Sequence, residues 1–411
     1  MTVRAGHYLI KSCKLSNFDN SKSIDISNLI YRFELSEGIF QQVIQARLYL
    51  YDTLDLIGGF PLIGEEGIFI TIQDFYGEDK SYLFHVNSIG PITTNVTSTG
   101  QDYSLELFTR EYVISEANEI REAFVGSPAT ISKDIHAKYL QTSKPFNYEF
   151  TSTSGTYVIP AMTPFETIDF LSRKSYSQTN KSSYFYFFET RDDYKFTTME
   201  QLIKDGRSNI KEFNYIDPTT VGKGTDQEFI MQNLISYRVE KRFNTLAEMR
   251  TGASVSRTFL IDLSKKTYEE FEYKHYENEN NLEKTDGNFA ESYHTGRFNQ
   301  NIFSDKNIIE SWIVFKDTTK LEDYYKEILP LRNSSEYFMD SIAITAKLHG
   351  RWSMNVGDMV RLTLPRSDAG DENLPDTGMD GDYLVESLNH TYNEDGWEIE
   401  MKLIKNALKD G

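Results

Sequence analysis

Several features that often reveal a function are scarce or missing in this sequence. A single cysteine, Cys13, excludes an internal disulfide and a cysteine-based zinc cluster. No run of 18 apolar residues occurs, and the first 20 residues lack the apolar core of a signal peptide. Only 10 of the 411 residues are proline, and no low-complexity linker is present. These absences predict a protein that is not inserted in a membrane and that is made in a reducing cytoplasm.

Positive charge is also in short supply. Lys and Arg total 43 against 62 Asp and Glu, which gives a formal net charge of −19. Since nucleic-acid binding depends largely on cations that neutralise phosphates, we expect no stable complex with DNA or RNA. The charge is compatible with a protein past which DNA slides without binding.

The motifs of common enzymes are missing as well. The seven histidines show no metal-binding i, i+4 spacing, and there is no P-loop, no G-x-S-x-G elbow and no strand-anchored G-x-G-x-x-G. We therefore expect no catalytic residue, no cofactor and no metal site. The acidic loop 367–382 is a weak calcium candidate, but its spacing is not that of an EF-hand, so a solvated or partner-contacting loop is favoured. Its candidate ligands are Asp368, Asp371, Asp376 and Asp380.

What the chain has in abundance is the alternation that predicts β-strands. Aromatic residues make up 14% of the chain, a proportion that suits extended structure. In GIFITIQDF the side chains of Ile68, Ile70 and Ile72 share one face, and GEDK then turns the chain into SYLFHVNSI. We predict a mainly β protein of the α+β class.

Residues 117–215 have helical signals instead. Ser127 and Thr163 each precede a proline, as N-cap residues often do, and Glu166 completes a capping box. The segment SYFYFFET, the turn RDD and YKFT then predict a hairpin. Together these features indicate a small α+β module.

Four parts follow from these patterns. A first β-domain covers residues 1–116, and the α+β module covers 117–215. A second, discontinuous β-domain comprises 216–271 and 336–411. A polar, turn-rich insertion at 272–335 interrupts it.

The first and last segments contain the same succession of elements, which indicates an internal repeat. GEEGIFITI (64–72) corresponds to NVGDMVRLTL (355–364), SYLFHVNSI (81–89) to GDYLVESLNH (381–390), and QDYSLELF (101–108) to GWEIEMKL (396–403). We predict two copies of one β-domain; two unrelated antiparallel meanders are the alternative interpretation. The predicted structural turns of the repeat are Gly64, Gly67, Gly357, Asp358 and Gly381.

The C-terminal pattern resembles that of the baseplate hub proteins of contractile-tailed bacteriophages. Its residues are Gly350, Trp352, Val356, Gly357, Asp358, Val360, Pro365, Gly381, Tyr383, Leu384 and Val385. The segment 157–196, YVIPAMTPFETIDFLSRKS followed by YFYFFETRDDYKF, is similar to the middle module of the T-even-like hub. The resemblance covers most of the chain and is poorest in 272–335.

The resemblance implies a structural protein and not an enzyme. Such hubs, which are related to the hub domains of type VI secretion spikes, carry two tail-tube-like β-domains per chain and form trimers. Six similar domains then adapt a six-fold tail tube to a three-fold spike. The implied partners are two further copies of the chain, the tail tube protein, a separate central spike protein and other baseplate proteins. The implied location is the tail baseplate of the virion, after assembly in the host cytoplasm.

In such a ring we expect DNA to pass along an acidic channel without stable binding. No spike-like extension follows the last predicted strand, so we expect the spike to be a separate protein. Two other functions are alternatives. A β-rich receptor-binding or adhesin tail protein would show lateral sugar pockets, whereas a hub would show an open axial channel. A cell-wall hydrolase would need paired acids, but the pairs Glu65–Glu66 and Asp192–Asp193 lie in predicted turns, where acids are simply solvated.

Overall fold

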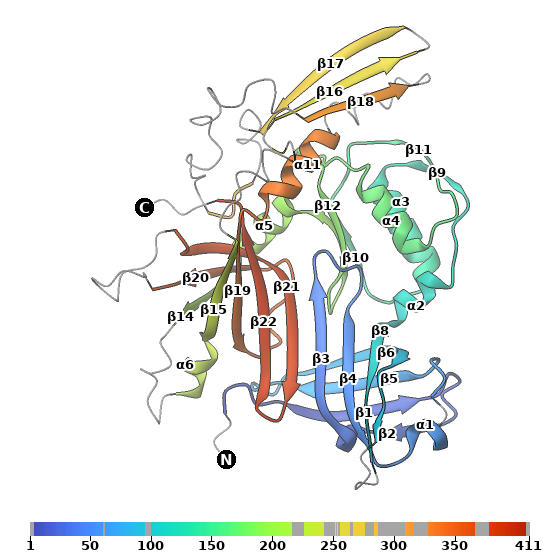
Figure 1. Cartoon of the computed structure of the whole chain (residues 1–411), viewed down its shortest axis with the longest axis vertical. Coiled ribbons are helices and arrows are strands. Elements are labelled where there is room, and N and C mark those ends of the chain that lie inside the picture. Colours follow the sequence, from blue (N-terminus) through green and yellow to red (C-terminus); the bar gives the residue numbers. More distant parts are fainter. Residues whose placement is uncertain are drawn as a thin grey trace.

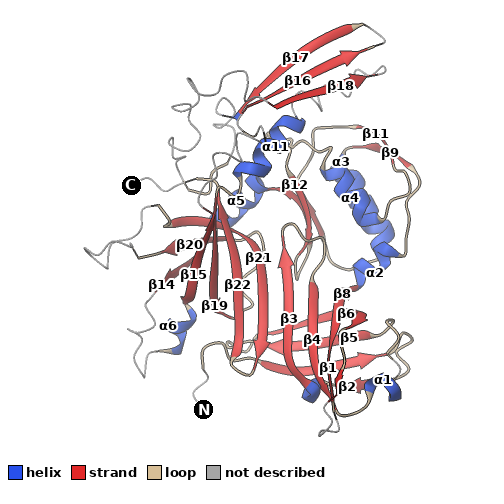
Figure 2. Cartoon of the chain, in the orientation of Figure 1, coloured by secondary structure: helices blue, strands red, loops and turns tan. Residues whose placement is uncertain are grey.

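The computed structural model is mainly β with a smaller helical content, which confirms the predicted fold class (Figure 2). The residues that it describes are 4–60, 62–94, 100–215, 226–241, 251, 253, 255–263, 266–275, 283–286, 309–315, 328–365 and 378–407. No helix within these ranges is long and apolar enough to cross a membrane.

The N-terminal part is an open antiparallel sheet, here called the first β-unit. Its main strands, in spatial order, are β1 (Leu9–Ser16), β5 (Gly67–Gln73), β6 (Asp79–Ile89), β8 (Gln101–Thr109), β4 (Gln45–Asp52) and β3 (Ile30–Gly38), with the short β2 (Ser23–Asp25) and β7 (Thr93–Thr94) beside β1 and β8. The predicted stripe of Ile68, Ile70 and Ile72 is fully buried in the core. A 3-10 turn (Ser27–Leu29) and helix α1 (Leu56–Gly59) lie in its loops.

The C-terminal part is a closed six-stranded barrel, here called the second β-unit. Its strands, in spatial order, are β14 (Lys211–Tyr215), β20 (Met359–Thr363), β21 (Gly381–Asn393), β22 (Gly396–Lys405), β19 (Ile342–His349) and β15 (Asn233–Lys241), which pairs with β14 and closes the barrel. Helix α6 (Gln227–Met231) leads into β15. The chain connects the strands of both units in the same spatial order, so β1, β5, β6, β8, β4 and β3 correspond to β14, β20, β21, β22, β19 and β15.

The two units also share their irregularities. The pairing of β6 with β8 slips between Val86 and Ser88, and that of β21 with β22 slips at the corresponding Val385 and Ser387. A second shared slip lies between Ile30 and Arg32 of β3 and at the corresponding place in β15. Because bulges are specific features of a fold, two shared bulges support the repeat. The units differ at one edge, where β1 runs antiparallel to β5 but β14 runs parallel to β20.

The α+β module packs its helices against a three-stranded sheet. The elements are α2 (Arg110–Glu116), β9 (Ala123–Gly126), α3 (Pro128–Ile135) with a π-helical turn (His136–Leu140), β10 (Phe146–Tyr148), β11 (Gly155–Val158), α4 (Pro164–Ser172), β12 (Phe185–Glu189), β13 (Tyr194–Thr198) and α5 (Met199–Arg207). The Ser127 cap, the Thr163–Glu166 capping box and the β12–β13 hairpin are all present, as predicted.

The remaining elements are a small sheet, which lies beyond helix α11 at the top of Figure 1, and α11 itself. Strands β16 (Val255–Asp262), β17 (Thr267–Lys274) and β18 (Ile309–Phe315) form a separate sheet, and helix α11 (Leu329–Phe338) leads back to β19. Part of the range 216–271, which we assigned to the second β-domain, therefore lies in this separate sheet. The sequence of that range did not show this, because an apolar-rich run such as that of β16 predicts a strand but not the sheet to which the strand belongs. The domain boundaries as a whole stay a prediction.

Candidate functional site

The described residues contain no group of three His, Cys, Asp or Glu side chains placed to hold a metal ion. Of the four candidate calcium ligands, Asp368, Asp371 and Asp376 lie outside the described residues. Asp380 is buried, and its carboxylate accepts a hydrogen bond from the Leu364 amide at 2.6 Å. The contact joins the end of β20 to the start of β21, so the Asp380 carboxylate has a structural role there.

The predicted turn residues differ in their backbone conformation and position. Gly64, Gly357 and Gly381 have positive φ angles of 93°, 81° and 120°, which side chains other than glycine rarely adopt. Gly67 is instead the first residue of β5, and an added methyl group there would meet no atom closer than 3.9 Å. The Asp358 carboxylate accepts a hydrogen bond from the Asn355 amide at 3.0 Å and forms an ion pair with Lys211.

The strand register shows that the counterpart of Asp358 is Glu66, a residue that the sequence comparison did not single out. Gly67 pairs with His85, and Met359 pairs with Leu384, so the residue before each strand corresponds. Glu66 accepts amide hydrogen bonds from Ile63 and Gly64 at 2.7 and 2.9 Å. The backbone carbonyls of Glu66 and Asp358 accept the amides of the corresponding Val86 and Val385. An acid before the strand is thus the shared signal.

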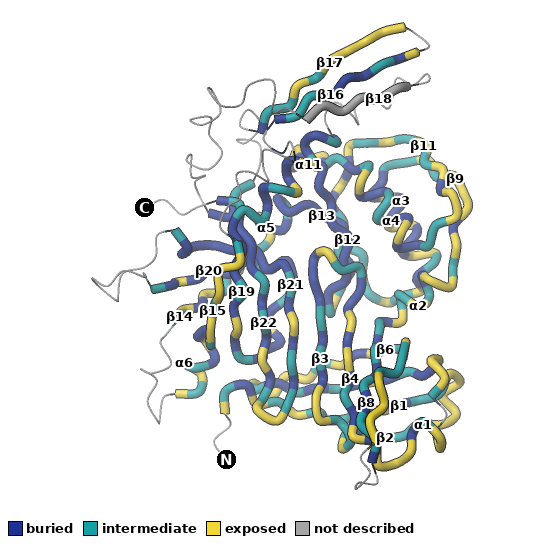
Figure 3. Tube along the Cα trace, in the orientation of Figure 1, coloured by how far each residue is buried: buried dark blue, intermediate teal, exposed yellow. Residues whose placement is uncertain are grey.

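Eight strands form one continuous sheet that crosses both β-units. Its order is β6, β8, β4, β3, β21, β22, β19 and β15, four strands from each unit, as Figure 1 shows from right to left. One face of this sheet is buried in the core. The other is polar and partly exposed, and we call it the polar face (Figure 3). A shallow groove of about 440 Å³ runs over it where β3, β4 and β8 meet β21 and β22.

Charges on the polar face are almost balanced. Five cations and seven carboxylates lie on its described strands, which leaves an excess of two negative charges on a chain of net charge −19. The cations are Arg32, Arg47, Arg238, Lys347 and Lys402, and the carboxylates are Glu34, Asp102, Glu106, Glu240, Glu386, Glu398 and Glu400. Every one of these cations lies in an ion pair with a neighbouring carboxylate.

The two β-units are joined directly by β3 and β21. Residues Phe33–Gly38 of β3 pair antiparallel with Ser387–Tyr392 of β21. Behind this ladder, buried Glu37 lies 3.3 Å from His390 Nε2, while Trp397 Nε1 donates to His390 Nδ1 at 3.3 Å. The histidine therefore has its Nε2 available as a donor to Glu37, so a polar contact ties the first unit to the second.

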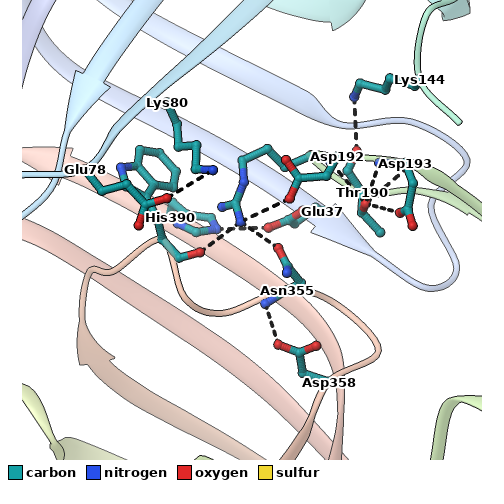
Figure 4. A network of polar contacts seen from close by, with 12 residues as sticks. Glu37, Glu78, Lys80, Lys144, Thr190, Asp192, Asp193, Asn355, Asp358 and His390 are labelled. Atoms are coloured by element: carbon teal, nitrogen blue, oxygen red, sulfur yellow. Dashed lines mark hydrogen bonds and ion pairs between the residues drawn. The ribbon is translucent and has the colours of Figure 1, made fainter. Parts of the chain in front are cut away.

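The α+β module enters the same junction through Arg191, at the turn between β12 and β13. Its guanidinium donates to the Trp352 carbonyl and to Asn355 Oδ1, both at 2.9 Å, and lies 5.3 Å from the centre of the Trp352 ring. In Figure 4, Asn355 lies in this network close to Glu37 and His390. Arg191 thus fixes the module to the place where both units meet. No motif in the sequence indicated this role.

A buried ion pair also lies at the same end of each unit. In the first unit Glu189 of the module accepts hydrogen bonds from the Ile44 amide and from Thr109, and Lys144 lies 2.6 Å away. Burial raises the pKa of Glu189, and Lys144 opposes this effect. In the second unit Lys405, which corresponds to Thr109, is fully buried 3.2 Å from Asp286. Burial lowers the pKa of Lys405. Each pair fastens an added segment onto a β-unit.

Comparisons with known proteins agree with this architecture. No protein-family model matches the sequence, and no curated protein matches it at a significant level. Solved structures do match. The tail protein from Neisseria meningitidis MC58 has a TM-score of 0.54 at 10% identity, over 98% of this chain and 100% of that one. The 43 kDa tail protein of prophage MuSo2 from Shewanella oneidensis has a TM-score of 0.57 at 12% identity, over 97% and 99%.

The chain therefore has the fold of phage tail proteins. The resemblance to phage tail proteins that the sequence suggested is confirmed at the level of the fold, because the match runs along nearly the whole of both chains.

Proposed function

We propose that the chain is the structural baseplate hub of a contractile phage tail. Three copies close into a ring that adapts a six-fold tail tube to a three-fold central spike, and the ring surrounds a channel through which DNA passes. Its partners are the tail tube protein, a separate spike protein and other baseplate proteins. Its place is the tail baseplate of the virion, after assembly in the host cytoplasm.

The observation that carries this proposal is the junction between β3 and β21. It joins two units of the same strand order edge to edge, so it supplies a pattern for joining further units. By the strand correspondence, the counterpart of β3 in the second unit is β15, and the counterpart of β21 in the first unit is β6. A second chain could therefore pair its β6 with β15 of the first chain in the same manner.

Both of these edges are open among the described residues. Strand β15 pairs with β14 only at Asn233 and Leu234, so residues 238–241 have no strand on that side. Strand β6 pairs with β5 only as far as His85, so residues 88–92 are open on the same side on which β21 receives β3. Unpaired strand edges are sites where another chain can add, and a closed ring removes them.

The known register fixes how the two open edges would meet. Glu34 pairs with Thr391 across the junction inside the chain, and the corresponding residues are Arg238 and Ile92. Leu35 and His390 correspond to Val239 and Pro91. Because Pro91 has no N–H group, the contact between chains would have one backbone donor fewer than the contact within a chain. Three chains of eight strands each would close a ring of twenty-four.

Cysteine cross-linking tests this arrangement. The double variant Arg238→Cys with Ile92→Cys places one thiol on each open edge, and the native Cys13 is buried and does not interfere. We expect mild oxidation to give covalent dimers and trimers that run as discrete bands under non-reducing conditions.

The matched control pairs Arg238→Cys with Thr71→Cys, which lies in the middle of β5, away from the open edge of β6. It should give no ladder, and neither should the single variants. A ladder that continues beyond trimer would indicate an open fibre and would contradict the ring. Equal cross-linking of the control would contradict the proposed edge.

A further inference from the structure

The geometry points to a role for the polar face as the wall of a DNA channel in which the cations are masked. By masked we mean that each arginine or lysine side chain is paired with a carboxylate, so that duplex DNA slides past without binding. This inference rests on the proposed function, because the polar face lines the channel only if the chains close into a ring. It differs from the acidic lining that we expected from the net charge, since this face is nearly neutral.

The central pair of the polar face shows how the masking works. Arg47 of β4 lies 2.6 Å from Glu106 of β8, its cross-strand neighbour. Glu106 also accepts a hydrogen bond from Ser88 at 2.8 Å. The Ser88 hydrogen bond and then Arg47 lower the pKa of Glu106, so the carboxylate stays charged. Both side chains are about half exposed, at 46% and 41%, so the pair faces solvent and is not buried for stability.

Two further pairs repeat this arrangement on neighbouring strands. Glu34 of β3 holds Arg32 and accepts a hydrogen bond from Tyr49 at 3.1 Å. Across the junction, Glu400 of β22 lies 3.4 Å from Lys347 of β19. Glu34, Glu106 and Glu400 all line the same groove. The masked cations are therefore spread over both β-units and form one surface.

Exposed ion pairs of this kind contribute little to stability, so their stability value does not account for them. Their electrostatic effect on a polyanion is larger. A free arginine or lysine that contacts a phosphate releases counterions and strengthens binding, whereas a cation already paired with a carboxylate gains much less. A wall of bare cations would hold DNA, and a wall of bare acids would repel it from the channel mouth. A wall of paired charges does neither.

The test replaces the masking carboxylates with neutral glutamine side chains and leaves the cations unchanged. The variant Glu34→Gln with Glu106→Gln and Glu400→Gln should bind a fluorescent 30-base-pair duplex at low salt, measured by anisotropy. We expect its affinity to exceed that of the wild type by about tenfold or more and to fall steeply as salt is added. Adding Arg47→Gln to this variant should remove part of the gain, which shows that a native cation makes the contact.

The control changes the net charge by the same amount elsewhere. Glu65, Glu116 and Glu228 are exposed and lie off the polar face, so their triple glutamine variant should bind no better than the wild type. Equal gains in both triple variants, or strong binding by the wild type, would overturn the inference. No gain in a folded Glu34, Glu106 and Glu400 variant would also overturn it. The cross-linked trimer could still form in that case, so the two proposals fail separately.

Discussion

At the scale of single residues, the molecule buries ionisable groups where its parts are fastened together. Lys405 and Glu189 each meet an opposite charge and at least one further hydrogen bond, so their burial is compensated. Glu200 of α5 is different. It is 6% exposed, one of its carboxylate oxygens has no hydrogen-bond partner among the described residues, and burial raises its pKa from 4.5 to about 7.

Glu200 should make stability depend on pH. Between about pH 4.5 and 7 the folded state keeps a proton that the unfolded state has lost, so the free energy of unfolding falls as pH rises through this window. Glu200→Gln stays neutral and should lose this slope. It should be more stable than the wild type at pH 8, by up to about 3 kcal/mol, in urea unfolding.

The exposed Glu65 provides the control, because Glu65→Gln should leave the pH dependence unchanged. If Glu200→Gln keeps the same pH slope as the wild type, Glu200 is not the group responsible.

Two glycines should differ sharply in their tolerance of a methyl group. A Cβ at Gly350 would lie 1.9 Å from the buried Trp397 ring, whereas one at Gly67 would have 3.9 Å of space. We expect Gly350→Ala to lower the free energy of unfolding by about 1–3 kcal/mol or more, because the ring has to move. Gly67→Ala should change it by less than about 0.5 kcal/mol. A large loss at Gly67 would show that the predicted turn role is real.

At the scale of elements, the molecule uses one turn and strand twice. In each copy an acid precedes the strand, and its carboxylate accepts hydrogen bonds from one or two amides of its own turn. Its backbone carbonyl accepts the amide of a valine that lies just before a β-bulge. The bulge bends the strand and allows its last residues to leave one neighbour and approach another. In β21 that neighbour is β3 of the other unit.

The two acids should therefore have similar importance. Glu66→Ala and Asp358→Ala each leave turn amides without an acceptor, so each should cost about 1–3 kcal/mol in urea or thermal unfolding. Glu65→Ala, one position from Glu66 but exposed, should be close to neutral. If only one of the two variants is destabilised, the two turns are not equivalent in energy.

At the scale of the whole molecule, two similar units and one module meet at a single junction. Arg191 reaches it from the module, Glu37 from the first unit and His390 from the second. Because three parts share this buried contact, we expect the eight-stranded sheet to move as one rigid body and not as two hinged units. A rigid body of this kind can hold the fixed angle between units that the proposed ring of three chains requires.

Much of the secondary structure could be predicted because the sequence patterns that indicate it are local. The alternation of Ile68, Ile70 and Ile72, the caps at Ser127 and Thr163, and the repeated order of strands all depend on neighbours in the chain. The exact correspondence of the two turns needed the strand register, which matches Gly67 of the first unit with Met359 of the second and not with Gly357. Glycine drew the attention, although the acid before the strand is the shared feature.

By itself, the sequence determined the type of the strands and helices that were predicted from it and the existence of a duplicated order, because short-range periodicity and capping decide these. Only the tertiary structure decided which edges pair, that the second unit closes while the first stays open, and that Arg191 and Lys405 are buried at junctions. Those outcomes depend on contacts between residues more than 100 positions apart, such as Arg191 with Trp352. The balanced charge of the polar face is of the same kind, because alternation selects which charges project together and strand pairing sets them side by side.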